Sequence, residues 1–342
     1  MDQTSEDRWL SASEPDGIRR RLQALGWLPD TTITHIKRAG EGNMNLTVRL
    51  VTANGESVIL KQSRPWVEKY PSIEAPEERI EFEHAFYRRV VGLPGVAERT
   101  PRVLAFDAAQ RLMLMEDLGE SSDFASLYGG GTLSEPTADA LVDWLAALHE
   151  HTRGTPDATM ANRSMRELNY AHIFDLPLRA AMLDEDTIEP GLAAAAAQLR
   201  EDAGYVAKVR MLGERYLDDG PCLLHGDFFP GSWLDTGAGV RVIDPEFGFY
   251  GAPEFDLAIS VAHLALTGQP WATAERWLSR YRAAVSCPVD EDLVAGFAAA
   301  EVMRRIIGVA QLPLSGEAVL RVGLLQASRR ALAERQCSAL WP

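Results

Sequence analysis

The sharpest constraint on the fold is a change of pattern near residue 118. Before this point, apolar residues fall in short strand-like runs, and Ala53-Asn54-Gly55 between two of the runs is a hairpin signal. After it, the apolar spacing is that of amphipathic helices. Strands and helices that are segregated along a chain predict an α+β fold. The expected strands are residues 33–39, 46–52, 56–62, 104–106 and 111–115.

Two lobes are expected, because 342 residues exceed the usual size of a single hydrophobic core. The first lobe, residues 1–118, should contain short N-terminal helices, a five-stranded antiparallel sheet and one further helix. The second lobe, residues 119–342, should be mostly helical. The expected helices lie within residues 5–26, 76–91, 134–151, 191–217, 254–267, 271–285, 291–311 and 316–335.

Composition narrows the class of protein. The net charge of −15 and the pI of about 5.0 disfavour a general nucleic-acid or anionic-membrane surface. The acidic N-terminus has no apolar core of the signal-peptide kind, and no apolar run is long enough to span a bilayer. The cysteines are odd in number and widely scattered, at positions 222, 287 and 337. We therefore expect a cytoplasmic protein with neither a nucleic-acid nor a membrane partner.

Two short loops interrupt the helical lobe, and each follows an apolar run. The stretch HGDFFPGS carries Asp227 and Ser232, and the stretch DPEF carries Asp244 and Glu246. Phosphoryl transfer needs one carboxylate that meets the acceptor hydroxyl and further oxygen ligands that hold Mg²⁺ on the nucleotide phosphates. Asp227 is therefore the candidate catalytic base, and Ser232, Asp244 and Glu246 are candidate metal ligands. A helix cap or a turn is the alternative for any single Asp in such a position.

Two histidines are expected to have structural roles. His225, two residues before Asp227, is expected to brace its loop through hydrogen bonds rather than to act as the general base. His149 is expected to be a packed helix residue.

The first lobe contains candidate phosphate-binding residues. The stretch GEGNMN joins two expected strands, and Gly40 and Gly42 would let backbone N–H groups approach a phosphate. A plain hairpin turn is the alternative. Lys61 ends an apolar strand, as a lysine that reaches the α- and β-phosphates should. Its expected carboxylate partner is Glu83, with Glu81 as the alternative.

Three further features concern adenine and the acceptor. The main chain from Glu116 to Leu118, at the end of MLMEDL, is a candidate for binding the adenine edge, with an ordinary strand end as the alternative. Arg304 and Arg305 follow one another in an apolar helix, so at least one should point to a pocket or a salt bridge. Trp233 should either line the acceptor pocket or belong to the core.

Taken together, these motifs resemble the aminoglycoside-phosphotransferase superfamily, which has a bilobal protein-kinase-like fold. Within it the chain is most similar to the 5-methylthioribose kinases. That family typically shows G-D-G-N-L-N, K-Q-A, H-G-D-L-H-T-G-S, D-P-E-F and I-R-R-I-I-G-L-A. The chain has GEGNMN, KQS, HGDFFPGS, DPEF and MRRIIGVA between residues 40 and 310.

The resemblance implies that ATP phosphorylates the anomeric hydroxyl of a 5-thio-substituted ribose, with Mg²⁺ as cofactor. It adds Asn43 and Asn45 of the glycine-rich turn to the nucleotide site, and it gives Arg304 and Arg305 to the sugar or to the moving phosphoryl group. Phe229 and Pro230 depart from the methylthioribose kinase pattern, which leaves a related pentose or another hydroxylated metabolite open as acceptor.

Two other functions stay open. One is an aminoglycoside- or choline-type kinase, and the other is a catalytically silent nucleotide-binding protein. In each case the partner is a small molecule, and a homodimer is possible.

Overall fold

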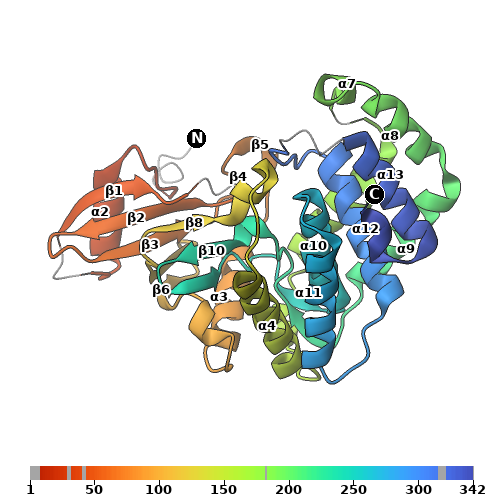
Figure 1. The fold of residues 1–342 in the computed structure, drawn as a ribbon. Helices are drawn as coiled ribbons and strands as arrows, with labels where there is room; N and C mark the ends of the chain where they lie inside the picture. Colours follow the sequence, from red (N-terminus) through yellow and green to blue (C-terminus); the bar gives the residue numbers. More distant parts are fainter. Residues whose placement is uncertain (1–7, 29–31, 41–43, 182, 315–320, 342) are drawn as a thin grey trace. The chain divides into compact units, whose positions relative to one another are not determined.

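The structure is a computed structural model that describes residues 8–28, 32–40, 44–181, 183–314 and 321–341. The chain separates into two compact units (Figure 1). The first comprises Met1–Gly92 and Thr100–Ser121, and the second comprises Leu93–Arg99 and Ser122–Pro342. The expected lobe boundary at residue 118 falls close to the end of the first unit. As a division of function it stays a prediction.

A five-stranded antiparallel sheet of order β1-β2-β3-β7-β6 forms the centre of the first unit, as expected. Its strands are β1 (Ile33–Arg38), β2 (Leu46–Thr52), β3 (Ser57–Gln62), β6 (Val103–Asp107) and β7 (Leu112–Glu116). The unit also contains α2 (Pro15–Ala24), α3 (Arg79–Val90) and a small hairpin of β4 (Trp66–Val67) and β5 (Tyr70–Glu74). The sequence analysis did not predict this hairpin, whose strands are very short.

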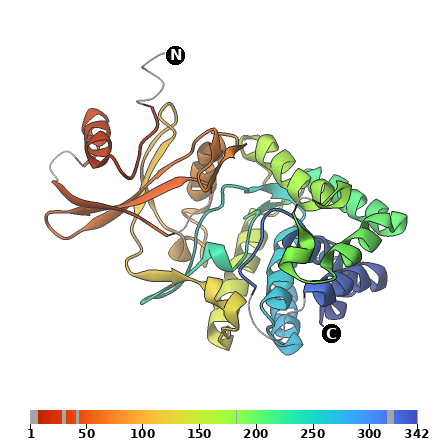
Figure 2. The same cartoon turned by 90° about the horizontal axis from the view of Figure 1, so that it is seen from above.

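Successive side chains of β3 point to opposite faces of this sheet, and the two faces differ in character. Leu60 belongs to an apolar cluster with Ile18 and Leu22 of α2, which covers one face of the sheet (Figure 2). The next residue, Lys61, points to the opposite face, where it meets Glu83 of α3. One strand therefore supplies a core residue and a buried cation in adjacent positions.

Helices dominate the second unit, as expected. Its main helices are α4 (Glu135–Thr152), α5 (Arg163–Tyr170), α8 (Leu192–Glu201), α9 (Ala203–Leu217), α10 (Glu254–Leu266), α11 (Trp271–Ala284), α12 (Glu291–Ile307) and α13 (Arg321–Glu334). Short helical segments are η1 (Ala97–Arg99), η2 (Phe124–Gly129), η3 (Ala158–Met160), η4 (Ala171–Asp175), α6 (Leu176–Arg179), α7 (Glu185–Ile188), η5 (Pro230–Ser232) and η6 (Cys337–Leu340). Helix α12 packs between α10 and α13 (Figure 1).

The helix expected over residues 191–217 is in fact two helices. The carboxylate of Asp202 accepts a hydrogen bond from the N–H of Tyr205 at 3.0 Å and so caps α9 directly after the end of α8. Helix α12 also ends four residues before its expected end, at Ile307. A Cβ at Gly308 would lie 2.4 Å from the carbonyl oxygen of Arg304, so the chain leaves the helix at a residue without a side chain.

Short strands in the second unit flank the two carboxylate loops. Strand β9 (Cys222–Leu224) leads into the first loop and pairs with β12 (Phe249–Gly251), which follows the second loop. Between the loops, β10 (Trp233–Thr236) and β11 (Gly239–Val242) form an antiparallel hairpin. Strand β10 also pairs with the three-residue strand β8 (Ser121–Asp123). Each loop is thus held by strand pairing at both of its ends.

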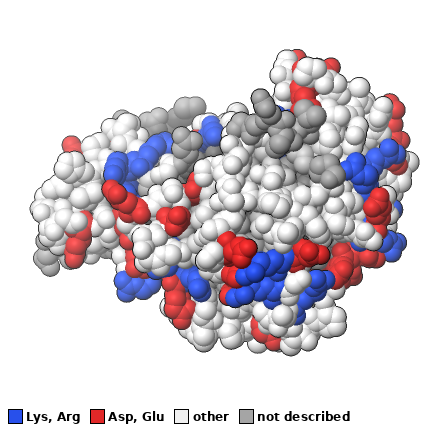
Figure 3. All heavy atoms as spheres, in the orientation of Figure 1, with Lys and Arg blue, Asp and Glu red and all other residues white. Residues whose placement is uncertain are grey.

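Within the described ranges, no helix has both the length and the apolar character needed to cross a membrane. Acidic and basic side chains intermingle on the face shown in Figure 3. Ion pairs of Arg276 and Arg280 with Asp139 and Asp143 join α11 to α4 in this way.

Candidate active site

The loop that carries Asp227 is fixed through its main chain. Asp256 of α10 is fully buried and accepts hydrogen bonds from the backbone N–H groups of His225 at 2.6 Å and Gly226 at 2.9 Å. Nε2 of His225 lies 2.9 Å from the carbonyl oxygen of Ile243, and Nδ1 accepts from the N–H of Asp227 at 3.3 Å. The expectation that His225 braces this loop is confirmed. These hydrogen bonds restrict the backbone immediately before Asp227.

Gly226 brings the two carboxylate loops into contact. Its φ of +84° lies in the left-handed region, which strongly favours glycine. A Cβ at this position would also come within 2.2 Å of the carbonyl oxygen of Phe247. The motif H-G-D therefore needs its glycine for two separate reasons.

The second loop has an unusual backbone. Asp244 has a φ of +62°, which is uncommon for a residue with a side chain. This conformation costs on the order of 1–3 kcal/mol and persists only where the surrounding structure enforces it. The buried side chain of Asn162 donates hydrogen bonds to the carbonyl oxygens of Glu246 and Gly248, both at 2.9 Å. Such strain often marks a functional position. Asn162 was missed in the sequence analysis, because 82 residues separate it from Asp244.

Two arginines of α12 approach the carboxylate of Asp227. Nη2 of Arg304 and Nη2 of Arg305 each lie 3.6 Å from its Oδ1. Both guanidinium groups also contact Glu301, one helical turn earlier. The expectation that one of the two arginines would point to a salt bridge or a pocket is confirmed. Although the two arginines are consecutive, they lie three and four positions after Glu301, and both reach its carboxylate.

The charges around Asp227 nearly cancel. Two carboxylates, Asp227 and Glu301, face two guanidinium groups. Burial raises the pKa of Asp227 to about 6, against the opposing effect of Arg305 and Arg304. Burial also acts to raise the pKa of Glu301, but Arg304 and Arg305 outweigh it and hold that pKa well below its usual range. Asp227 keeps 23% of its side chain exposed, so a small molecule can reach it.

In the first unit, Lys61 and Glu83 form a buried ion pair. Nζ of Lys61 lies 2.8 Å from Oε1 and 2.7 Å from Oε2 of Glu83, and both side chains are almost fully buried. Glu81 instead pairs with Arg111 on the surface. The choice of Glu83 over Glu81 as the partner of Lys61 is confirmed. Its role in nucleotide binding stays a prediction.

The glycine-rich turn lies only partly within the described residues. Gly40 has a φ of +71° and open space around its Cβ position, whereas Gly42 and Asn43 lie outside the described residues. Asn45 is buried, and its Oδ1 accepts a hydrogen bond from Arg79 at 2.9 Å. Arg79, which the sequence analysis missed, also donates to the carbonyl oxygen of Met44 at 2.7 Å, so it holds the end of the turn.

The candidate adenine-binding segment ends β7. The N–H of Glu116 donates to the carbonyl oxygen of Arg102 at 2.9 Å, and its carboxylate accepts from the N–H of Arg102 at 3.1 Å. This leaves Leu118, two residues on, as the better candidate for a main-chain contact to adenine. Both assignments stay predictions.

The oxygen atoms predicted to bind Mg²⁺ fit a hard cation. Glu246 and Ser232 are buried, and the hydroxyl of Ser232 donates to the carbonyl oxygen of Asp227 at 2.9 Å, which leaves its lone pairs for a metal. In the described part of the chain, no three His, Cys, Asp or Glu side chains gather in a metal-binding group. Mg²⁺ at phosphoryl-transfer sites usually takes only one or two carboxylates and adds phosphate and water oxygens. Asp244, Glu246 and Ser232 match that donor set.

Trp233 is fully buried and packs against other aromatic side chains. Its ring centroid lies 5.2 Å from that of Phe228 and 5.8 Å from that of Trp277. The core alternative accounts for these contacts. A contact between Trp233 and an acceptor stays an untested prediction.

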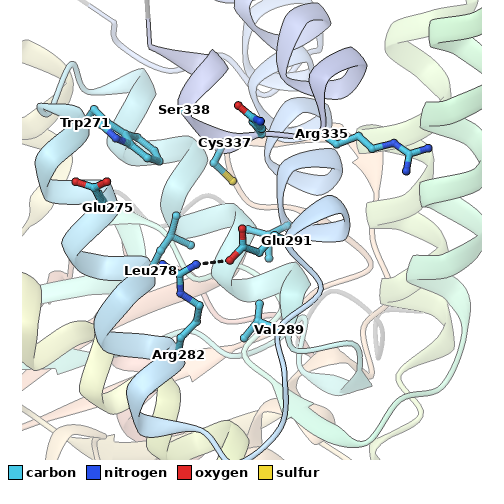
Figure 4. Close-up of a pocket in the computed structure, with 11 residues that line it drawn as sticks. Trp271, Glu275, Leu278, Arg282, Val289, Glu291, Arg335, Cys337 and Ser338 are labelled. Carbon is cyan, nitrogen blue, oxygen red and sulfur yellow. Dashed lines mark hydrogen bonds and ion pairs between the residues drawn. The ribbon is translucent and has the colours of Figure 1, made fainter.

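A cavity of about 300 Å³ lies elsewhere in the second unit, between α11, the start of α12 and the C-terminal segment (Figure 4). Arg282 and Glu291 on its wall pair with each other. The cavity has no residue in common with the predicted site.

Comparison with known structures defines the class of fold. Choline kinase LicA from Streptococcus pneumoniae matches over 95% of this chain and 100% of its own, with a TM-score of 0.56 at 16% identity. A choline/ethanolamine kinase family protein from Mesorhizobium loti matches over 95% of this chain and 98% of its own, with a TM-score of 0.55 at 17% identity. The chain therefore has the protein-kinase-like fold of these proteins.

Sequence comparison gives the family. Residues 35–301 match the phosphotransferase enzyme family, so the chain belongs to it. The methylthioribose kinase of Citrobacter koseri is 26% identical over 71% of this chain, and methylthioribose kinase 1 of Oryza sativa subsp. japonica is 29% identical over 68%. The chain spans 63% and 56% of these two relatives' own lengths. The resemblance to methylthioribose kinases is thereby confirmed.

Proposed function

We propose that the protein is an ATP-dependent, Mg²⁺-dependent small-molecule kinase that phosphorylates the 1-hydroxyl of S-methyl-5-thioribose or of a closely related pentose. The observation that carries the proposal is the pair Arg304 and Arg305 at 3.6 Å from the carboxylate of Asp227. The methylthioribose kinases of Citrobacter koseri and Oryza sativa support the choice of acceptor.

In this proposal Asp227 orients the acceptor hydroxyl and takes its proton late in the transfer. Both arginines approach Oδ1, which leaves Oδ2 to accept the hydrogen bond of the hydroxyl. With a pKa of about 6, the carboxyl is largely ionised at neutral pH and still basic enough to receive the proton.

Arg304 and Arg305 have two tasks in the transfer. They keep Asp227 ionised, and they offer N–H donors to the oxygens of the sugar or of the transferred phosphoryl group. Lys61, held by Glu83, binds the nucleotide phosphates. Mg²⁺, held by Asp244 and Glu246 with Ser232, would neutralise charge on the phosphate oxygens.

The electrostatics favour a neutral acceptor. A polycationic aminoglycoside or a quaternary ammonium compound would have to approach Asp227 beside two buried guanidinium groups. A sugar carries no such charge, and its hydroxyls can accept hydrogen bonds from both arginines.

A choline- or aminoglycoside-type kinase is the second candidate. It is supported by the fold of choline kinase LicA, which has also been solved in complex with AMP. A catalytically silent protein is disfavoured, because Lys61, Glu83, Asp227 and Asp244 are all present.

The test is acceptor phosphorylation followed by mass spectrometry. Purified protein with ATP and Mg²⁺ should add one phosphate to methylthioribose, and should leave choline and kanamycin unmodified. Asp227→Asn should bind ATP as the wild type does but lose at least about 10²-fold in turnover. Phosphorylation of choline or kanamycin alone would replace the proposal with the second candidate, and unchanged turnover in Asp227→Asn would remove Asp227 from its role.

A further inference from the structure

Three buried polar side chains lie directly behind the two arginines of α12. Tyr128 of η2, His263 of α10 and Glu301 of α12 are each no more than 2% exposed. Oη of Tyr128 lies 2.6 Å from Nδ1 of His263, and Nε2 of His263 lies 3.0 Å from Oε1 of Glu301. Residues from three distant parts of the sequence thus form one continuous chain of hydrogen bonds.

Chemistry fixes the direction of these bonds. An ionised Glu301 can only accept, so Nε2 of His263 carries the hydrogen and donates. Nδ1 is then a bare acceptor, and the hydroxyl of Tyr128 donates to it. Burial lowers the pKa of His263 to about 4 and raises the pKa of Tyr128 well above its usual range, so both groups are neutral at physiological pH. His263 is therefore held in a single tautomer.

Glu301 in turn binds both arginines. Its Oε2 accepts from Nε of Arg304 at 2.5 Å, and its Oε1 accepts from Nε of Arg305 at 2.7 Å. Both Nε atoms are tied to one carboxylate, so the orientation of that carboxylate sets where both Nη2 atoms lie. Those Nη2 atoms are the ones at 3.6 Å from Asp227.

We propose that Tyr128, His263 and Glu301 form a positioning relay that holds Arg304 and Arg305 against Asp227. The inference rests on the proposed function, because it concerns the groups that carry out that reaction. Stability alone is a weak explanation, since buried charges usually stabilise a protein no better than apolar side chains of the same volume. A relay that fixes geometry explains why four charges and a neutral imidazole are buried together.

A second chain of the same composition serves the same loop. Oη of Tyr281 lies 2.7 Å from Nδ1 of His149, and Nε2 of His149 lies 3.2 Å from Oδ2 of Asp256. Asp256 in turn holds the backbone of the loop that carries Asp227. One Tyr–His–carboxylate chain therefore fixes the main chain of this loop, and the other fixes the cations that face its catalytic side chain.

The mildest test removes one hydroxyl. Tyr128→Phe should lower kcat by about 3–10-fold, the usual consequence of losing one buried hydrogen bond, while the KM for ATP stays unchanged. Tyr205→Phe is the matched control, because Oη of Tyr205 makes a buried hydrogen bond of 2.9 Å to Ser328, away from the site. The control should lose a similar amount of thermal stability and keep its kcat. Equal kcat values in the two variants would overturn the relay.

A double-variant comparison separates positioning from general stability. Glu301→Gln alone should lower kcat by about 10²-fold, as expected when reacting groups are misplaced by an ångström or so. In the Arg305→Lys background, Tyr128→Phe should lower kcat much less than it does in the wild type. The guanidinium group that Tyr128 helps to position is already absent from that background. Fully additive effects would overturn the relay, and this comparison still decides if Glu301→Gln does not fold.

Nitrogen-15 NMR of labelled histidine tests the relay without any acceptor. One imidazole, identified by its loss in His263→Gln, should show a protonated Nε2 and an unprotonated Nδ1, and Tyr128→Phe should change that signature. If the signature holds but methylthioribose is not phosphorylated, the acceptor assignment fails and the relay stands. If methylthioribose is phosphorylated but His263 has the opposite tautomer, the relay fails and the proposed function stands.

Discussion

Asp227 shares its surroundings with two guanidinium groups and a second carboxylate, and this balance of charge determines its chemistry. Burial alone would favour the protonated, unreactive acid. Arg305 and Arg304 oppose that effect, and the pKa settles at about 6. At the scale of single residues, the pKa of Asp227, the proposed base, therefore depends on side chains that lie more than seventy positions away in the sequence.

Lys61 and Glu83 allow a direct test of a buried pair. Glu83→Gln should lower the free energy of unfolding by about 3–5 kcal/mol, because it neutralises the carboxylate that pairs with a buried ammonium group. Glu81→Gln on the same helix is the control and should cost about 0–1 kcal/mol, because Glu81 pairs with Arg111 at the surface. Denaturant unfolding measures both. Equal losses would mean that the Lys61–Glu83 pair contributes no more than a surface pair.

His263 predicts a dependence of stability on pH. Its pKa is about 4 in the folded protein, below its ordinary value near 6.5, because burial disfavours the imidazolium. Between these values the unfolded chain binds a proton that the folded protein does not, so this contribution is complete above pH 6.5 and falls as the pH approaches 4. The loss is at most about 3 kcal/mol.

The comparison of wild type with His263→Gln isolates this contribution. Asp227 acts in the opposite direction, because its raised pKa makes the folded protein bind a proton first as the pH falls through about 6. The groups that face His263 are Glu301, Arg304, Arg305 and Tyr128. Unfolding free energies at several values between pH 7.5 and 4.5 should converge as the pH falls. Parallel pH profiles would contradict the neutral state of His263.

At the scale of elements, the site is built by two pairs of strands. The β9–β12 pair and the β10–β11 hairpin leave two loops free of pairing, and these loops carry Asp227 and Asp244. Gly226 and Phe247 bring the loops together through a backbone approach that tolerates no side chain. The register of four short strands therefore determines where the carboxylates lie.

Gly226→Ala tests this close approach. Gly191 is a matched control, since its φ of +86° is nearly the same as the +84° of Gly226 but its Cβ position is open. Gly191→Ala should cost about 1–2 kcal/mol of stability, the price of left-handed backbone alone. Gly226→Ala should cost about 1–3 kcal/mol more, because the backbone of the second loop must also move. Equal shifts in denaturant unfolding would show that the contact between the loops relaxes freely.

At the scale of the whole molecule, nucleotide binding should depend on the metal. ATP with Mg²⁺ should stabilise the protein by RT ln(1 + [L]/Kd), about 2.7 kcal/mol at one hundred times Kd, and chelation should remove most of this gain. Asp244→Ala should abolish the Mg²⁺-dependent part. Asp235→Ala, which changes an exposed residue of the β10–β11 hairpin that precedes Asp244, should leave it intact. Calorimetric unfolding measures this stabilisation. If Mg²⁺ and ATP stabilise Asp244→Ala as much as the wild type, Asp244 is not a metal ligand.

Local patterns were sufficient for much of this protein. The segregation of strands and helices, the two carboxylate loops and the lysine at the end of an apolar strand all follow from short-range preferences of the residues themselves. The spacing of apolar residues was less informative where a polar side chain ends or begins a helix. Asp202 divides an expected helix by capping the next one, and the pattern of apolar residues does not register that hydrogen bond.

Only the tertiary structure decided which distant groups meet. Glu83 rather than Glu81 reaches Lys61, because helix α3 turns that face toward the sheet. Tyr128, His263 and Glu301 come together because α10 packs against α12 and the hydroxyl of Tyr128 reaches His263 from η2, although nothing in their local sequence marks them. Periodicity depends on neighbours along the chain, whereas the ionisation of a buried group depends on neighbours in space. For that reason the sequence alone could point to Asp227 and Asp244 as candidates, and only the folded structure showed which buried side chains surround Asp227.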